Sequence, residues 1–177
     1  MPNLHAPDAA SLAEYLRRNQ PELMSAINEA VRKGAEIRTR PAIVAAARSW
    51  LGTPYHHAAD IKGVGVDCAM LLVRVFCDLG LVPPFDPRPY VRDWMLHRSE
   101  EKFAGFLLAR AQEVGSPEPG DVVLFRVGRC FAHGGIVTQT YPLIFVHASS
   151  SSGCVVEEQL DRQPDFGARP RKFFAVA

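Results

Sequence analysis

The sequence lacks several features that would point to particular classes of protein. None of its apolar runs approaches the ~20 residues that a membrane-spanning helix needs. Neither sign of charge dominates, because 20 basic and 19 acidic residues leave a formal net charge of +1. This balance gives no electrostatic reason to expect nucleic acid or an anionic membrane as the main partner. The N-terminal stretch has no basic segment followed by an apolar one, so no signal peptide is expected. The chain is therefore expected to be cytoplasmic as synthesised.

Cysteine is also scarce, with four residues in 177. This number is too small for a disulfide scaffold, so each cysteine is expected to be a free thiol, a ligand or a nucleophile. No internal repeat is evident. The length predicts one main domain with a short addition, which we place at residues 39–177 and 1–38.

Apolar periodicity predicts helices in the first half of the chain and strands in the second. Helical spacing, with proline starts and glycine stops, predicts helices over 8–19, 21–34 and 41–51, then over 68–79 and 99–112. Alternation predicts strands over 121–127, 132–139, 142–148, 154–160 and 172–176. Helices followed by a meandering antiparallel sheet indicate the α+β class.

Cys68 lies at the predicted start of the 68–79 helix, behind Asp67 at the N-cap position. The unpaired N–H groups and positive dipole end of a first helical turn favour a thiolate, which would make Cys68 a nucleophile. Its own N–H could then face an oxyanion. Burial as an inert small hydrophobe is the competing interpretation.

His133 and His147 fall on consecutive predicted strands, symmetrically about Thr140. A three- or five-residue connection centred there would set the two imidazoles directly opposite each other on one face of the hairpin. Together with Cys68 they would supply a thiol, a base and a residue that orients the base. His5, His56, His57 and His97 are expected at the surface.

Cys130, His133, His147 and Cys154 allow a second interpretation. Two sulfurs and two nitrogens could bind zinc, although their spacing is unusual. Without that site, no cofactor is expected.

Four motifs in order, "SWLGTPYHHAADIKGVGVDC", "PGDVVLF", "AHGGIV" and "FVHA", resemble those of the NlpC/P60 cysteine peptidases. The resemblance covers about residues 41–177, and it is greatest to the branch encoded with phage tails and gene-transfer agents. It implies a papain-like α+β fold and hydrolysis of amide bonds in peptidoglycan stem peptides, typically between γ-D-glutamate and a diamino acid. It also implies phage-tail proteins as partners, and a chain that is associated with a virion or tail and acts in the cell wall.

The same resemblance implies that Cys68 is the nucleophile, His133 the general base and His147 the third polar residue, with Tyr55 as an active-site tyrosine. Asp67 is either only the helix cap or also a receptor for a free substrate amine. After the cysteine the family commonly has Ser-Gly, where this chain has Ala69 and Met70. These positions are associated with close substrate approach.

The expected mechanism is a thiolate–imidazolium pair that attacks the scissile carbonyl and passes through a thioester. Tyr55 and the N–H of Cys68 would stabilise the oxyanion, and His147 would orient His133. Since protonated His147 could not do this, activity should fall below about pH 6. A catalytically silent protein that only binds peptidoglycan is the alternative. The N-terminal helices could pack on the domain, cover its groove or mediate self-association.

Overall fold

The computed structural model describes residues 9–91 and 101–176, and the chain divides into two compact units, Met1–Arg38 and Thr39–Ala177. Helix α1 (Ala9–Arg48) begins in the first unit and ends in the second. Within the second unit, Ile43 and Ala47 of α1 are buried in the core.

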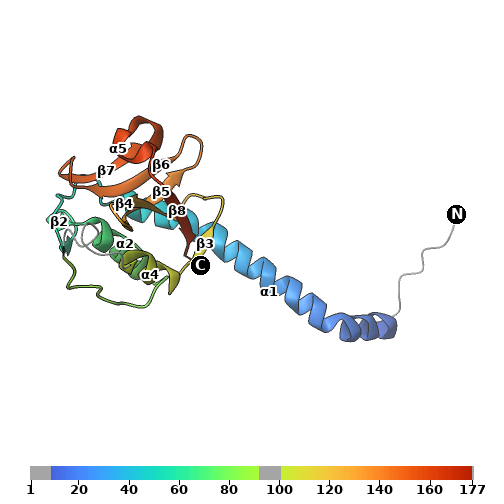
Figure 1. Ribbon diagram of the computed structural model, residues 1–177. Helices are drawn as coiled ribbons and strands as arrows, with labels where there is room; N and C mark the ends of the chain where they lie inside the picture. Colours follow the sequence, from blue (N-terminus) through green and yellow to red (C-terminus); the bar gives the residue numbers. More distant parts are fainter. Residues whose placement is uncertain (1–8, 92–100, 177) are drawn as a thin grey trace. The chain divides into compact units, whose positions relative to one another are not determined.

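The remaining elements belong to the second unit (Figure 1). The helices are α2 (Cys68–Asp78), α4 (Lys102–Leu108), the 3-10 turn η1 (Leu160–Arg162) and the single turn α5 (Pro164–Gly167). The strands are β1 (Asp60–Ile61), β2 (Gly65–Val66), β3 (Gln112–Val114), β4 (Val122–Val127), β5 (Cys130–Gln139), β6 (Ile144–Ser149), β7 (Cys154–Gln159) and β8 (Arg171–Ala175).

The strands form two antiparallel sheets. One contains β1 and β2, and the other has six strands in the order β3-β8-β4-β5-β6-β7. Helix α2 contacts β5 and β6. In Figure 1, α2 and α4 lie on one side of the large sheet and α5 lies on the other. The α+β prediction is therefore confirmed.

Alternation along the strands produces a separate apolar cluster on each face of the large sheet. The larger cluster joins α2, through Leu71, Val75 and Phe76, to Ile136 and Val146. The smaller cluster, on the side of α5, contains Val123, Phe125, Val137, Phe145 and Leu160, with Phe166 packed against it. Strand β5 contributes to both clusters, so its successive residues reach opposite sides of the sheet.

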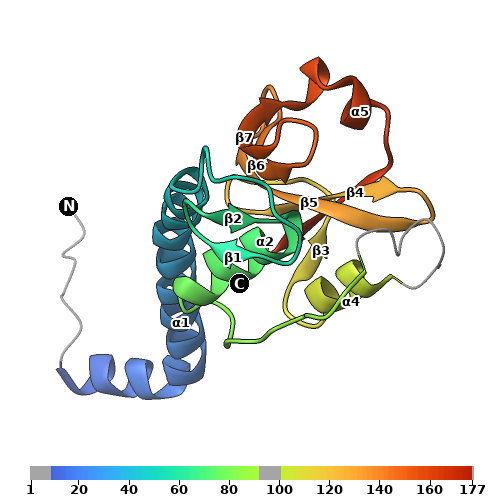
Figure 2. The same ribbon diagram turned by 90° about the vertical axis from the view of Figure 1, so that its left-hand side faces the viewer.

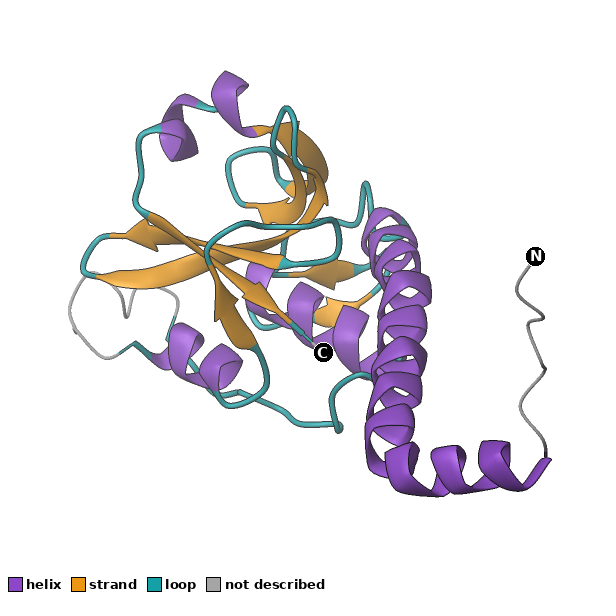
Figure 3. Cartoon of the chain, turned by 90° about the vertical axis from the view of Figure 1, so that its right-hand side faces the viewer, coloured by secondary structure: helices purple, strands orange, loops and turns teal. Residues whose placement is uncertain are grey.

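The three helices predicted before residue 52 are one helix in the structure. Pro21, Gly34 and Pro41 all lie inside α1, so the predicted ends at these residues are wrong. A proline removes one intrahelical hydrogen bond and a glycine costs about 1 kcal/mol. Neither need end a helix that is otherwise rich in alanine, glutamate and arginine. Figures 2 and 3 show a bend in the N-terminal part of α1, for which an internal proline is a usual cause.

The other predictions differ from the structure mainly at element ends. The five predicted strands correspond to β4–β8, with bounds that agree to within two residues. The predicted 99–112 helix is shorter, as α4, and residues 99–100 lie outside the described part. Strands β1–β3 were not predicted, because stretches of two or three residues carry no detectable alternation.

Candidate functional site

Cys68 is the first residue of α2, as predicted. The Asp67 side chain caps this helix by accepting a 2.9 Å hydrogen bond from the N–H of Met70. The backbone N–H groups of Gly134, Ala69 and Cys68 itself act to lower the pKa of the thiol, in order of decreasing effect. Gly134 directly follows His133 on β5, so the sulfur lies near the sheet backbone beside that histidine.

The resting sulfur is nevertheless not a stabilised thiolate. Burial, followed by the negative charge of Asp67, raises the pKa of Cys68 to about 12, against the opposing effect of the three N–H groups. The expectation that the helix N-terminus would make this thiol acidic is therefore wrong for the unliganded protein. Backbone N–H groups do lower the pKa of the thiol, but the loss of solvation raises it by more.

A cavity of about 570 Å³ opens beside Cys68. Tyr55, Asp67, Cys68 and Ala69 all line it, so it brings together four of the residues predicted from the sequence. Most of the remaining wall is apolar and comes from α2, α4 and the proline-rich segment 82–91. The wall includes Leu72, Val73, Phe76, Phe85, Tyr90 and Phe106.

His133 and His147 contact each other across the β5–β6 pair. Nε2 of His133 lies 2.8 Å from Nδ1 of His147, and the rings are nearly perpendicular. Both therefore project from the same face, as predicted. This face carries Val137 and Phe145 of the smaller apolar cluster, so the expectation that it would lie against the helix of Cys68 is wrong. They are not directly opposite, however, because Val137 pairs with Phe145, which places His147 across from Gly135. The pairing is offset by two residues from the predicted one, and an offset of two preserves the face.

A β-bulge lies beside His133. Phe125 pairs with His133 and Arg126 with Phe131, which leaves Ala132 as the extra residue of β5. Such bulges commonly redirect a neighbouring side chain. The His133 ring stacks on Phe166 with centroids 4.8 Å apart and also contacts Phe125, so the smaller apolar cluster holds the imidazole from that side.

Both imidazoles are neutral in this setting. Burial lowers the pKa of His133 well below its usual value, and His147 and Arg169 lower it further. Burial also lowers the pKa of His147, with partial opposition from Glu158. That carboxylate lies 2.9 Å from Nε2 of His147. The site at rest thus holds a neutral thiol and two neutral imidazoles.

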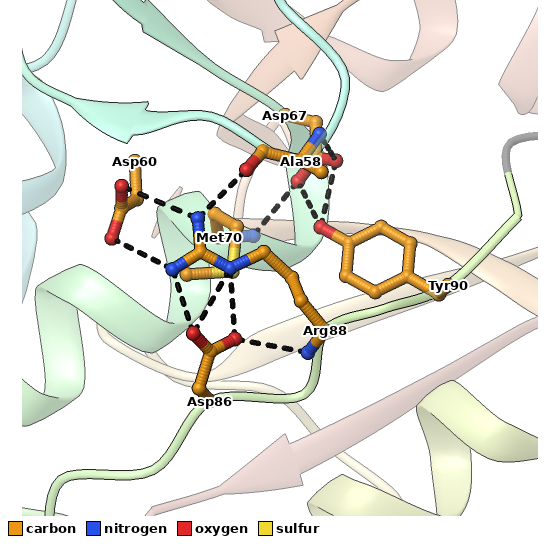
Figure 4. Close-up of polar contacts among 7 residues, drawn as sticks. All are labelled: Ala58, Asp60, Asp67, Met70, Asp86, Arg88 and Tyr90. Atoms are coloured by element: carbon orange, nitrogen blue, oxygen red, sulfur yellow. Dashed lines mark hydrogen bonds and ion pairs between the residues drawn. The ribbon is translucent and has the colours of Figure 1, made fainter.

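Asp67 has a second set of partners besides the helix cap (Figure 4). Its carboxylate accepts hydrogen bonds from the N–H of Ala58 at 2.7 Å and from the hydroxyl of Tyr90 at 2.7 and 2.9 Å. Arg88 donates to the carbonyl of Ala58 and also pairs with Asp60 and Asp86. The proline-rich segment is thereby tied to the start of α2.

Two predicted placements differ from the structure. Met70 is only 2% exposed and packs in the larger apolar cluster, so its side chain does not reach the cavity. His57 is not a simple surface residue, because it lines the cavity and its Nδ1 lies 3.4 Å from Asp67. His56 is exposed as expected, whereas His5 and His97 lie outside the described residues.

Tyr90 and Glu158 also belong to the site, and neither was predicted from the sequence. Tyr90 follows four prolines in a segment without periodicity, which carries no signal for its contact with Asp67. Glu158 could have been singled out only with the register of β6 against β7, since neighbouring Glu157 faces the other way and pairs with Arg48.

Within residues 9–91 and 101–176, no group of three or more potential ligands is arranged to hold a metal ion. The proposed zinc set also conflicts with the geometry. His133 Nε2 and His147 Nδ1 face each other at hydrogen-bonding distance, which leaves no room for a metal between them. The same part of the chain contains no helix with the length and hydropathy of a membrane span.

Comparison with known proteins identifies the fold. No family model matches the chain, and no curated protein sequence does. Among solved structures, the NlpC/P60 domain of the peptidoglycan hydrolase SagA matches 75% of this chain and 96% of its own, with a TM-score of 0.52 and 18% identity. The peptidoglycan hydrolase RipB from Mycobacterium tuberculosis matches 96% of this chain and 86% of its own, with a TM-score of 0.55 and 15% identity.

A third similar structure is an N-acetylmuramoyl-L-alanine amidase from Bacteroides uniformis. It matches 79% of this chain and 99% of its own, with a TM-score of 0.55 and 12% identity. At these identities the similarity shows a shared fold. Over most of its length the chain has the fold of NlpC/P60 domains.

Proposed function

We propose that the chain is a cysteine peptidase of the NlpC/P60 family that hydrolyses amide bonds in peptidoglycan stem peptides. One observation carries this proposal: the sulfur of Cys68 lies at a helix N-terminus, beside a cavity, against the backbone N–H of the residue that follows His133. The peptidoglycan hydrolases of the same fold support the choice of substrate. The four sequence motifs support the phage-tail and gene-transfer-agent branch, and with it tail proteins as partners.

In this mechanism Cys68 attacks the scissile carbonyl carbon. The S–H bond breaks as the S–C bond forms, and Nδ1 of His133 takes the proton. Because both groups are neutral at rest, the proton moves during the attack, instead of forming a stable ion pair beforehand. His133 then returns the proton to the leaving amine, and water hydrolyses the thioester.

The cavity side of the site receives the substrate. The hydroxyl of Tyr55 and the N–H of Cys68 stabilise the developing oxyanion, and loss of one such donor commonly costs about 3 kcal/mol of transition-state stabilisation. Ala69 lines the cavity beside Cys68, so its methyl group limits how closely a stem peptide approaches. Asp67 serves chiefly as the helix cap, because internal donors already occupy both of its oxygens.

Mass spectrometry of muropeptides released from purified peptidoglycan tests this proposal. The full chain should release peptides that end at D-glutamate and expose a new diamino-acid amine, and Cys68→Ala should release none. Cys77→Ala, a matched change of a half-buried cysteine in the same helix, should behave as the unmodified chain. Equal release by Cys68→Ala, or binding of peptidoglycan without any release, would overturn the proposal.

A further inference from the structure

A carboxylate continues the histidine pair on the side away from His133. The side chain of His147 is fully buried, and its two ring nitrogens have different partners: Nδ1 faces His133 at 2.8 Å and Nε2 faces Glu158 at 2.9 Å. Glu158 comes from β7, next to β6, and its side chain is only 17% exposed. A single line of hydrogen bonds thus crosses three neighbouring strands.

The position of the protons along this line follows from the chemistry of the groups. A carboxylate can only accept, so Nε2 of His147 carries a hydrogen and donates it to Glu158. A neutral imidazole has one N–H, which leaves Nδ1 of His147 as an acceptor. Nε2 of His133 must then be the donor to it, and Nδ1 of His133 is left without a hydrogen. In the proposed mechanism, that nitrogen is the one that accepts the proton of Cys68.

We infer that Glu158 is a positioning residue that selects, through His147, the tautomer of His133 able to act as a base. This inference deepens the proposed function and rests on it, because it takes Cys68 as the nucleophile. Without the carboxylate, His147 can instead carry its hydrogen on Nδ1 and donate to His133. His133 would then be protonated on Nδ1 and unable to accept the thiol proton.

Glu158 also compensates the charge that forms during the reaction. When His133 accepts the proton it becomes an imidazolium, and Arg169, the cation that acts on it, opposes that charge. The negative charge of Glu158 instead stabilises the His133 imidazolium, through the polarised ring of His147. Such compensation strengthens when the groups are buried, because the local dielectric is low.

Aromatic packing also holds the orientation of the His147 ring. Phe145 lies 4.8 Å from the His147 ring and Phe166 lies 5.5 Å from it, between centroids. Removing the carboxylate charge should therefore change which nitrogen carries the hydrogen and leave the ring in place. This separates a positioning role from a merely structural one.

The ring nitrogen chemical shifts of the full chain, measured by NMR on ¹⁵N-histidine protein at pH 7.5, test the inference directly. Both His133 and His147 should show a protonated Nε2 and an unprotonated Nδ1. Glu158→Gln should shift one or both rings toward protonated Nδ1. Glu157→Gln, which removes the same charge one residue away on the opposite face of β7, should leave both tautomers unchanged.

Kinetics provide the second measurement. Because a wrong tautomer removes the base without removing the substrate site, Glu158→Gln should lower kcat about 10- to 100-fold with little change in KM. In a His147→Ala background the same substitution should change kcat less than about twofold, since Glu158 would have lost the residue through which it acts.

The two measurements separate the inference from the proposed function. If peptidoglycan is not hydrolysed, the proposed function fails, while the tautomers of the unmodified chain still report on Glu158. Protonated Nδ1 in His147 of the unmodified chain would overturn the inference without any variant having to fold. The inference would also be overturned if folded Glu158→Gln kept the tautomers and kcat of the unmodified chain. An equal fall in kcat on introducing Glu158→Gln into the His147→Ala background would overturn it as well.

Discussion

The hydroxyl of Tyr90 lies 2.7 Å from one carboxylate oxygen of Asp67 and 2.9 Å from the other. A residue of the proline-rich segment thereby completes the set of donors around the cap of the helix that begins with Cys68. Asp67 is 2% exposed, so these donors replace the water that its charge would otherwise hold. The packing of a loop is in this way linked to the electrostatics of the sulfur.

Tyr90→Phe should destabilise the fold because it removes one donor from a buried carboxylate. We expect the free energy of unfolding to fall by about 1–3 kcal/mol, the usual cost of leaving such a group short of a partner. Urea unfolding measures it, with Tyr141→Phe as the control, since Tyr141 is 94% exposed. A loss no larger than that of the control would show that the Tyr90 hydroxyl contributes nothing.

Asp67→Asn should make Cys68 more reactive. The negative charge of Asp67 is the second cause, after burial, that raises the pKa of the thiol, so its removal should lower that pKa and increase the thiolate fraction. Asparagine still serves as a helix N-cap, so α2 should persist. Iodoacetamide labelling at pH 8, followed at Cys68 by peptide mass spectrometry, should be faster than in the unmodified chain.

Asp60→Asn is the matched control for that labelling. It removes a carboxylate from the same network at a point where the charge is paired with Arg88, not directed at the sulfur. An equal acceleration in both variants would mean that loosening of the network, and not the charge of Asp67, controls the thiol.

Local pattern and spacing in the sequence were sufficient for the strands β4–β8, the start of α2 and the shared face of the histidine pair. The face survived an error in register because strand side chains repeat every two residues. To predict whether His133 and His147 pair directly, one must know the geometry of the turn between their strands. Their equal spacing from Thr140 in the sequence does not give that geometry.

Burial could not be predicted from the same patterns. The acidity of Cys68 depends on how much water reaches the sulfur and how close Asp67 comes, and both are properties of the assembled fold. Met70 looked like a substrate contact because it follows Cys68 in the family motif, yet helix rotation turns its side chain into the core. Glu158 needed the β6–β7 register, which is a contact between separate strands.

The acid limb of the pH–rate profile should lie below the usual pKa of histidine, 6.5. Burial lowers the pKa of His133 and of His147, so both rings stay neutral and able to act to a lower pH than isolated histidines would. The sequence-based value of about pH 6 takes no account of this burial. We expect kcat/KM for stem-peptide hydrolysis to stay near its maximum at pH 6.5. A half-maximal value at or above pH 6.5 would contradict it.

The same two histidines should make the fold less stable in acid. Their folded-state pKa values lie below those of the unfolded chain, so the unfolded state binds more protons once the pH drops below about 6.5. Stability is therefore complete above that pH and declines as the pH falls toward the folded-state values. The thermal midpoint should decrease from pH 7.5 to 5, and this slope should be smaller in His133→Gln/His147→Gln. Exposed His56→Gln should retain the full slope, and an equal slope in all three proteins would exclude these histidines as its source.

Gly135→Ala should damage the β5–β6 pair at the point where it positions the histidines. A Cβ at residue 135 would lie 2.8 Å from the carbonyl oxygen of Val146, which is closer than real contacts allow, and 3.1 Å from Cβ of His147, which is tighter than most real contacts. The obstructing groups are backbone and a buried ring, so relief requires the strands to separate. We expect a loss of about 1–3 kcal/mol in unfolding free energy, typical of overpacking, together with reduced hydrolysis.

Gly115→Ala is the control, since nothing lies within 4 Å of its added methyl group. Equal stability and activity in both variants would mean that close approach at Gly135 does not hold His147 beside His133.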